Sequence, residues 1–175
     1  LVQTGLPNRN YQYLAKTPVD KDQFTGRIDL NESTKSQWFG RYSWTDELTI
    51  SPGVRLNGTG LYTRASQWVL SNTRVLSSTK VNEARFGYNS LLNNISQELA
   101  SAENVNEKLN TPIKVTDPNS WGVPDINLTG STLNRFGNDA NGPFSIDNKV
   151  YQFVDNFSWI AGKHSFRFGG EYRYN

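Results

Sequence analysis

The 175-residue sequence predicts an all-β fold, an antiparallel up-and-down meander of about six strands. Three observations lead to this prediction. Apolar and polar side chains alternate with a period of two in several separate runs, which is typical of strands. These runs join in pairs across short segments rich in turn formers, as the strands of hairpins do. Longer polar connections separate one pair from the next.

The first predicted hairpin covers residues 23–46. Its two runs, QFTGRIDLN and QWFGRYSWTDE, each alternate between an aromatic or aliphatic face and a polar face. Two alignments of these runs remain open. One sets Asp29 opposite Arg41, and a shift by two residues sets Arg27 opposite Arg41. Opposite charges favour the first alignment by ~0.2–1 kcal/mol.

The second predicted hairpin covers residues 62–89 and follows a loop at 46–60. Its first strand alternates poorly, whereas the second, VNEARFGYN, places Phe86 and Tyr88 on one face and Arg85 on the other. A short turn joins the two. The prediction of this hairpin therefore depends mainly on its second strand.

A long polar connection, residues 90–148, separates the second hairpin from the third. Within it the run SQELASAENVNEKLN predicts a short helix with Ser96 as its N-cap, and residues 125–129 predict a short strand. Compact domains seldom carry an irregular connection of this length unless it has a function. We therefore expect a functional loop here.

The third predicted hairpin covers residues 149–174. The dipeptide Gly162-Lys163 suits a two-residue turn with Gly in the first position. Pairing about this turn places eight aromatic residues on one face, in opposed pairs: Trp159 with Phe166, Phe157 with Phe168, Phe153 with Tyr172, and Tyr151 with Tyr174.

One charged residue, Asp155, falls on this aromatic face, opposite Gly170 and near the middle of the strand. A charge would be unfavourable there if the face met lipid. We therefore expect a β-bulge at Val154-Asp155 or at Gly169-Gly170 that turns Asp155 to the polar side. A regular ladder through both strands would exclude the bulge.

The connections between predicted strands alternate between short and long. Short turns at one end and long loops at the other are typical of outer-membrane β-barrels, and strands of about ten residues fit the ~9–11 needed to cross a bilayer. No apolar run approaches the ~20 residues of a spanning helix, so a membrane role would depend on strands. The pattern favours a transmembrane β-barrel with long extracellular loops.

In such a barrel the aromatic side chains face lipid and the polar ones face the lumen. The residues predicted to face lipid or to form interfacial girdles are Phe24, Trp38, Tyr42, Trp44, Phe86, Tyr88, Phe157, Trp159, Phe166 and Phe168. The residues predicted to line the lumen are Arg27, Arg41, Arg85, Arg167, Glu171 and Arg173.

The alternative is a soluble all-β binding module that buries its aromatic face under a second layer. Surface Trp and Tyr residues would then offer stacking platforms for carbohydrate. Dependence on detergent distinguishes the two, because only the barrel needs a membrane environment. A packed layer over Trp38, Trp44 and Phe166 would favour the soluble module.

Composition argues against an enzyme. The chain has no Cys and a single His, His164, which excludes thiol catalysis and His-rich metal sites. Its net charge of +2 is dispersed, so no nucleic-acid partner is indicated. The spacing of Asp139, Asn141 and Asp147 matches no calcium-binding loop. We predict no catalytic, cofactor-binding or metal-binding residue. Because the chain contains no Met, we expect a processed or internal piece of a longer protein.

Three segments, FGRYS at 39–43, VNEARFGYN at 81–89 and SWIAGKHSFRFGGEYR at 158–173, carry a family resemblance. They resemble strands of the TonB-dependent transporters of the bacterial outer membrane, and most of all the Oar-like group that carries a carboxypeptidase-regulatory-like domain. The resemblance covers about 23–92 and 149–174. It implies a barrel of about 22 strands closed by an internal plug, of which residues 1–175 supply about six strands and no recognisable plug.

The resemblance also implies a location and a set of partners. The strands would contact outer-membrane lipid, the plug domain and the remaining barrel strands of the parent chain. The plug would in turn receive energy from the TonB complex. Loops 46–60 and 90–148 would lie outside the cell and capture a bulky ligand of unknown identity for uptake or export.

Overall fold

The computed structural model describes residues 13–54, 56–130, 135–138 and 142–175, and the chain forms two compact units. We call the first the strand unit; it contains Lys21–Glu47, Thr63–Asn93 and Ile146–Asn175. We call the second the loop unit; it contains Leu1–Asp20, Leu48–Tyr62 and Asn94–Ser145.

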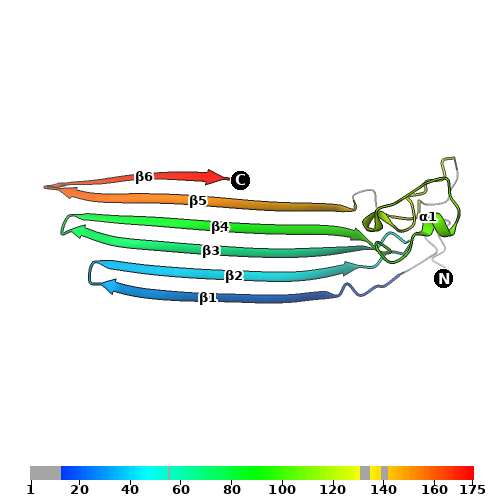
Figure 1. Ribbon diagram of the computed structural model, residues 1–175, viewed down its shortest axis with the longest axis horizontal. Helices are drawn as coiled ribbons and strands as arrows, with labels where there is room; N and C mark the ends of the chain where they lie inside the picture. Colours follow the sequence, from blue (N-terminus) through cyan, green and yellow to red (C-terminus); the bar gives the residue numbers. More distant parts are fainter. Residues whose placement is uncertain (1–12, 55, 131–134, 139–141) are drawn as a thin grey trace, which may run out of the picture. The chain divides into compact units, whose positions relative to one another are not determined.

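Six antiparallel strands form one sheet in which every strand pairs with its neighbours in the sequence (Figure 1). This confirms the predicted all-β meander. The strands are β1 (Val19–Ser33), β2 (Ser36–Ser51), β3 (Thr59–Ser77), β4 (Lys80–Gln97), β5 (Phe144–Ala161) and β6 (His164–Tyr174). Within the part of the chain that the structure describes, the edge strands β1 and β6 each have a partner on one side only.

Most strands are longer than the ten residues expected, and the long connections are correspondingly shorter. β4 continues to Gln97 and β5 begins at Phe144, so their connection spans 98–143 instead of 90–148. The connection between β2 and β3 spans 52–58 instead of 46–60. Backbone pairing continues to the ends of β3 and β4, where the Glu98 N–H donates to the Gly58 carbonyl at 2.9 Å.

The predicted helix with Ser96 as its N-cap is wrong. Ser96 belongs to β4, where its hydroxyl donates to the Gly60 carbonyl at 3.4 Å. The helix α1 covers only Val105–Lys108, and its N-cap is Asn104, whose side chain accepts from the Glu107 N–H. The pairing of β4 with β3 therefore prevails over the helical propensity of the first half of the run.

The strand expected at 125–129 is reduced to an isolated antiparallel bridge. Ile126 pairs with Phe136, and the two residues exchange backbone hydrogen bonds of 2.8 and 3.1 Å. A short 3₁₀ helix, η1 (Pro118–Ser120), precedes it. The loop unit also holds Val105 and Val123, which are 8% and 7% exposed and are the buried hydrophobic residues of the described chain.

The third hairpin has the predicted register. Trp159 pairs with Phe166, and the ladder continues without interruption to Tyr151 and Tyr174. Gly162 has a φ of 61°, as a turn with Gly in the first position requires.

The expected β-bulge at Asp155 is wrong. Asp155 pairs with Gly170, and Asn156 with Gly169, in an unbroken ladder. Because side chains alternate strictly along a regular strand, Asp155 stays on the same face as Phe153 and Phe157. No bulge turns Asp155 to the polar side. Its carboxylate instead accepts a hydrogen bond from a side chain of a neighbouring strand.

The first hairpin has the alignment that repulsion between like charges disfavours, with Arg27 opposite Arg41. The hydroxyl of Thr25 donates to that of Ser43 at 3.2 Å, a contact that needs these short side chains to be directly opposed. This register sets Arg27 opposite Arg41. The charges find other partners, since Arg27 binds Asp29 on its own strand and Arg41 donates to Gln67 of β3 at 2.8 Å.

Successive hairpin turns are staggered. The Val75 N–H donates to the carbonyl of Lys35 in the β1–β2 turn at 2.7 Å, and β3 continues beyond Val75 to Ser77. The Ile160 N–H donates to the carbonyl of Thr79 in the β3–β4 turn at 2.8 Å, and β5 continues to Ala161. Each hairpin therefore extends past the turn of the one before it.

No helix among residues 13–54, 56–130, 135–138 and 142–175 is both long and apolar enough to cross a membrane.

Candidate functional site

One side of the strand unit carries a nearly continuous layer of aromatic rings, which we call the aromatic face. Ring pairs connect adjacent strands across it at centroid distances of 4.3 to 5.6 Å. The pairs are Tyr42 with Trp68, Phe86 with Phe153, Tyr88 with Tyr151, and Trp159 with Phe166. Strand alternation places Phe24, Trp38, Trp44, Phe157 and Phe168 on the same side, so all ten residues predicted for this face share it.

Trp68 belongs to the aromatic face, although the sequence pattern does not predict it there. Its strand alternates poorly, because Ser66 and Asn72 share the face with Trp68 and Leu70. The spacing of Trp68 and Leu70 by two residues was the available signal. Trp68 remains 52% exposed even though it packs against Tyr42.

The aromatic face has no covering layer of side chains in the strand unit. Trp38 is 37% exposed, Phe166 is 41% exposed and Phe168 is 56% exposed. Large apolar side chains left in water at this density are unusual for a soluble sheet. The side chains instead present a broad apolar surface outward.

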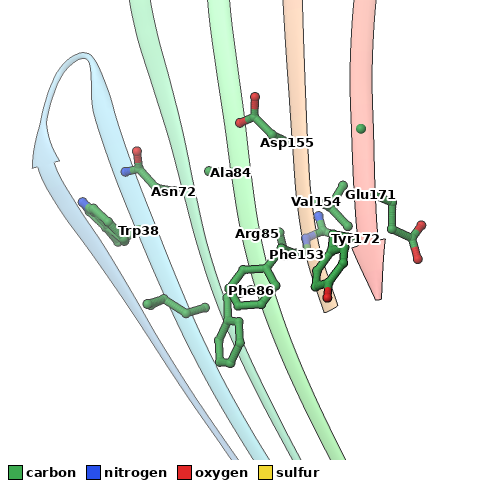
Figure 2. Close-up of a pocket in the computed structure, with 12 residues that line it drawn as sticks. Trp38, Asn72, Ala84, Arg85, Phe86, Phe153, Val154, Asp155, Glu171 and Tyr172 are labelled. Carbon is green, nitrogen blue, oxygen red and sulfur yellow. The ribbon is translucent and has the colours of Figure 1, made fainter. Parts of the chain in front are cut away.

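Asp155 lines a hollow in the aromatic face (Figure 2). The side chains of Asn72, Ala84 and Asp155 follow one another across β3, β4 and β5 there. Bulkier residues border them, namely Trp38, Leu70, Phe86, Phe153 and Tyr172. Small and polar residues therefore interrupt the aromatic layer around Asp155.

Asp155 is held by a neighbouring strand. The side-chain amide of Asn82 on β4 donates to Asp155 Oδ1 at 2.8 Å. Asn72 likewise donates to the hydroxyl of Ser36 and to the carbonyl of Gln37, both at 3.2 Å. The polar side chains on this face thus bind each other or the backbone, which lowers the cost of placing them among apolar groups.

An ion pair lies on the aromatic face, at the end of the aromatic layer that is nearer the long connections. Arg64 of β3 donates to Asp46 Oδ2 through two nitrogens, at 2.9 and 2.6 Å. Asp46 lies two residues beyond Trp44 and so on the same face. The aromatic layer therefore gives way to charge at this level of the sheet.

The opposite side of the strand unit, the polar face, carries the residues predicted to line a lumen. Three of the arginines pair with acids two residues away on the same strand: Arg27 with Asp29 at 2.7 Å, Arg85 with Glu83 at 2.6 Å, and Arg173 with Glu171 at 3.1 Å. Glu171 also accepts from Gln152 of β5 at 2.8 Å. Arg167 lies opposite Ser158 on the same face.

Arg41 differs from these arginines because it joins a chain of neutral groups. It donates to Gln67 Oε1 at 2.8 Å, and Gln67 Nε2 donates to Asn89 Oδ1 at 2.8 Å. Arg27, Arg41 and Arg85 line one hollow of the polar face. The structure thus brings together three of the six predicted residues, whereas Arg167, Glu171 and Arg173 lie on β6.

Neither face forms a metal centre. Among the described residues no group of three or more His, Asp or Glu side chains is placed to hold a metal ion. Asp139 and Asn141, whose spacing with Asp147 matches no calcium-binding loop, lie outside the described residues. What the two faces offer is an apolar surface on one side and hydrogen-bonded charges on the other.

The sequence matches one family model, which is described as an outer membrane beta barrel domain and covers residues 2–175. That stretch includes all six strands and both long connections. Comparison with curated proteins and with solved structures gives no match.

Proposed function

This chain belongs to the outer membrane beta barrel domain family and resides in the outer membrane, and from this premise we propose that its sheet is part of the wall of a TonB-dependent transporter. The observation that carries the proposal is the two-faced sheet. Its aromatic face is exposed and uncovered, and its polar face carries networks of charge. That division is the one a barrel wall needs between lipid and a wet lumen.

In this proposal the aromatic face contacts lipid. Trp38 and Trp159, close to the short turns, belong to the girdle at the periplasmic side. Trp44 and Tyr88, nearer the long connections, belong to the outer girdle, and the Asp46–Arg64 pair lies beyond it. The short turns then face the periplasm and the connections 52–58 and 98–143 face the exterior.

The polar face lines the lumen, where it contacts a plug domain or a passing ligand. Arg27, Arg85 and Arg173 have acidic partners on their own strands. Arg41 instead donates to the neutral Gln67, so its charge is available to an acidic group of a plug or ligand. The chain performs no chemistry, because energy for transport comes from the TonB complex acting on the plug.

A soluble binding module is the weaker alternative. It would need a second layer over Trp38, Trp44 and Phe166, and two of these are at least 37% exposed. The described core of two valines lies in the loop unit. A sheet without a buried face gains too little from the hydrophobic effect to be stable in water.

The five tryptophans offer a direct test of the lipid-facing assignment. Trp38, Trp44, Trp68 and Trp159 lie on strands and on the aromatic face, whereas Trp121 lies in the loop unit. Single-Trp variants of the full-length protein, with every other tryptophan changed to Phe, are reconstituted in vesicles whose acyl chains carry bromine. We expect strong quenching of the four strand tryptophans and little quenching of Trp121. Equal quenching of all five would contradict the proposal.

Dependence on TonB is tested separately. The full-length protein should bind the purified periplasmic domain of TonB, and deletion of the plug should abolish that binding while single-Trp quenching persists. Binding that survives removal of the plug, or no binding by the intact protein, argues against a TonB-dependent transporter but leaves the barrel wall in place.

A further inference from the structure

We infer that the loop unit holds a binding site for a neutral oligosaccharide, in a pocket formed by the ends of β4 and β5 and by the segment 117–120. The inference rests on the proposed function, in which this unit faces the exterior. The pocket has a volume of about 560 Å³, within the usual range for small-ligand sites. Its lining residues are Asn94, Ile95, Ser96, Asp117, Asn119, Ser120, Pro143, Phe144 and Ser145.

The walls of the pocket are tied together by hydrogen bonds from separate parts of the chain. Ser145 of β5 donates to Asn94 Oδ1 of β4 at 2.6 Å. The Ser101 N–H donates to the Pro118 carbonyl at 2.8 Å, which anchors the segment 117–120 to the chain that follows β4. Within that segment, the Asn119 N–H donates to Asp117 Oδ1 at 3.0 Å.

These bonds leave hydrogen-bonding capacity inside the pocket. Among the described residues, the second carboxylate oxygen of Asp117 and the side-chain N–H groups of Asn94 and Asn119 have no partner. A carboxylate accepts from hydroxyl groups, and amide N–H groups donate to hydroxyl oxygens. Adjacent hydroxyl groups of a sugar both donate and accept, so they match this combination.

Charge and shape narrow the choice of ligand. The lining has one carboxylate and no Lys, Arg or His, which disfavours phosphate, sulfate and carboxylate ligands. The Phe144 side chain, 40% exposed, and the Pro143 ring supply apolar surface for the C–H face of a sugar ring. A site with several convergent polar groups beside an aromatic ring suits a neutral, hydroxyl-rich ligand.

Calorimetric titration of the full-length protein tests this inference. The detergent must not itself be a sugar, so lauryldimethylamine oxide replaces maltosides and glucosides. The probes are maltotriose, cellotriose, xylotriose and chitotriose. We expect at least one to bind, and we expect Asn119→Ala and Phe144→Ala each to weaken binding tenfold or more.

Two further variants separate a direct role from a loss of folding. Asp117→Asn keeps the acceptor that holds the Asn119 N–H and removes only the charge, so the pocket should persist while affinity falls. Glu103→Gln removes a charge elsewhere in the loop unit, where Glu103 pairs with Lys108, and should leave affinity unchanged. Circular dichroism confirms that each variant retains its β-content.

Three results would overturn the inference: no binding of any trisaccharide at millimolar concentration, binding that all the pocket variants retain, or equal loss of affinity in Glu103→Gln. None of these affects tryptophan quenching by brominated lipid or binding to TonB. Failure of the site is therefore distinguishable from failure of the proposed transporter.

Discussion

At the scale of single residues, Asp155 decides how the aromatic face tolerates charge. It stays on that face in a regular ladder and accepts one hydrogen bond from Asn82. If lipid covers the face, Asp155→Asn should raise the free energy of unfolding of the full-length barrel in vesicles by roughly 1–2 kcal/mol, because acids in the apolar belt are penalised. Urea titration followed by tryptophan fluorescence measures this.

A substitution of Asn82, measured by the same urea titration, tests the hydrogen bond to Asp155. Asn82→Leu should lower stability by about 1–3 kcal/mol, because Asp155 would lose its donor in apolar surroundings. In an Asp155→Leu background the same change should not lower stability and should raise it slightly, since Asn82 has then lost its acceptor. On the polar face, Asp29→Asn removes the charge that pairs with Arg27 and should not stabilise. Equal stabilisation by Asp29→Asn and Asp155→Asn would show that the two faces meet the same surroundings.

At the scale of elements, the β5–β6 hairpin depends on the conformation of its turn. Gly162 has a φ of 61°, and a Cβ placed there would meet nothing within 4 Å. Gly162→Ala should therefore cost about 1–2 kcal/mol through backbone strain alone. Gly170 is a matched control on the same hairpin, since its Cβ would also meet nothing and its φ is not positive. Similar unfolding midpoints for the two variants would contradict a strained turn.

At the scale of the whole molecule, the sheet has two open edges and no buried face. β1 and β6 each leave one row of backbone hydrogen-bonding groups unpaired within the described chain. Such edges pair with other chains when they are exposed. Residues 1–175 expressed alone should therefore require detergent and should aggregate in plain buffer. Size-exclusion chromatography checks this, and a monodisperse, β-rich protein without detergent would contradict it.

Local patterns in the sequence predicted the hairpins well and the contacts between them poorly. The pairing of Trp159 with Phe166 follows from a two-residue turn, so adjacent residues determine it. The alignment of β1 with β2 depends instead on Arg41, whose partner Gln67 comes from a third strand. The position of Asp155 also depends on a residue distant in the sequence, because its hydrogen-bond donor Asn82 lies 73 positions away in the chain.

The extent of β4 was missed for the same reason. The run after Ser96 has helical propensity, yet pairing with β3 extends the strand to Gln97. The pocket of the loop unit has no signal in the sequence, since it combines Asn94, Asp117 and Ser145 from three separate stretches. Contacts of this kind become visible only once the strands are in register.

The stagger of the turns determines which residues of neighbouring strands would lie at the same depth in a bilayer. If all short turns lie at one membrane surface, the strands must lean by about 35–45°. Tyr88 lies eight residues from Lys80, the first of β4, and Tyr151 lies ten residues from Ala161, the last of β5. These two rings touch, yet in that orientation they would lie at unequal depths. In that orientation a contour of constant depth runs diagonally across the sheet, and single spin labels can trace it, because residues 1–175 contain no Cys that would take up label within this part of the wall.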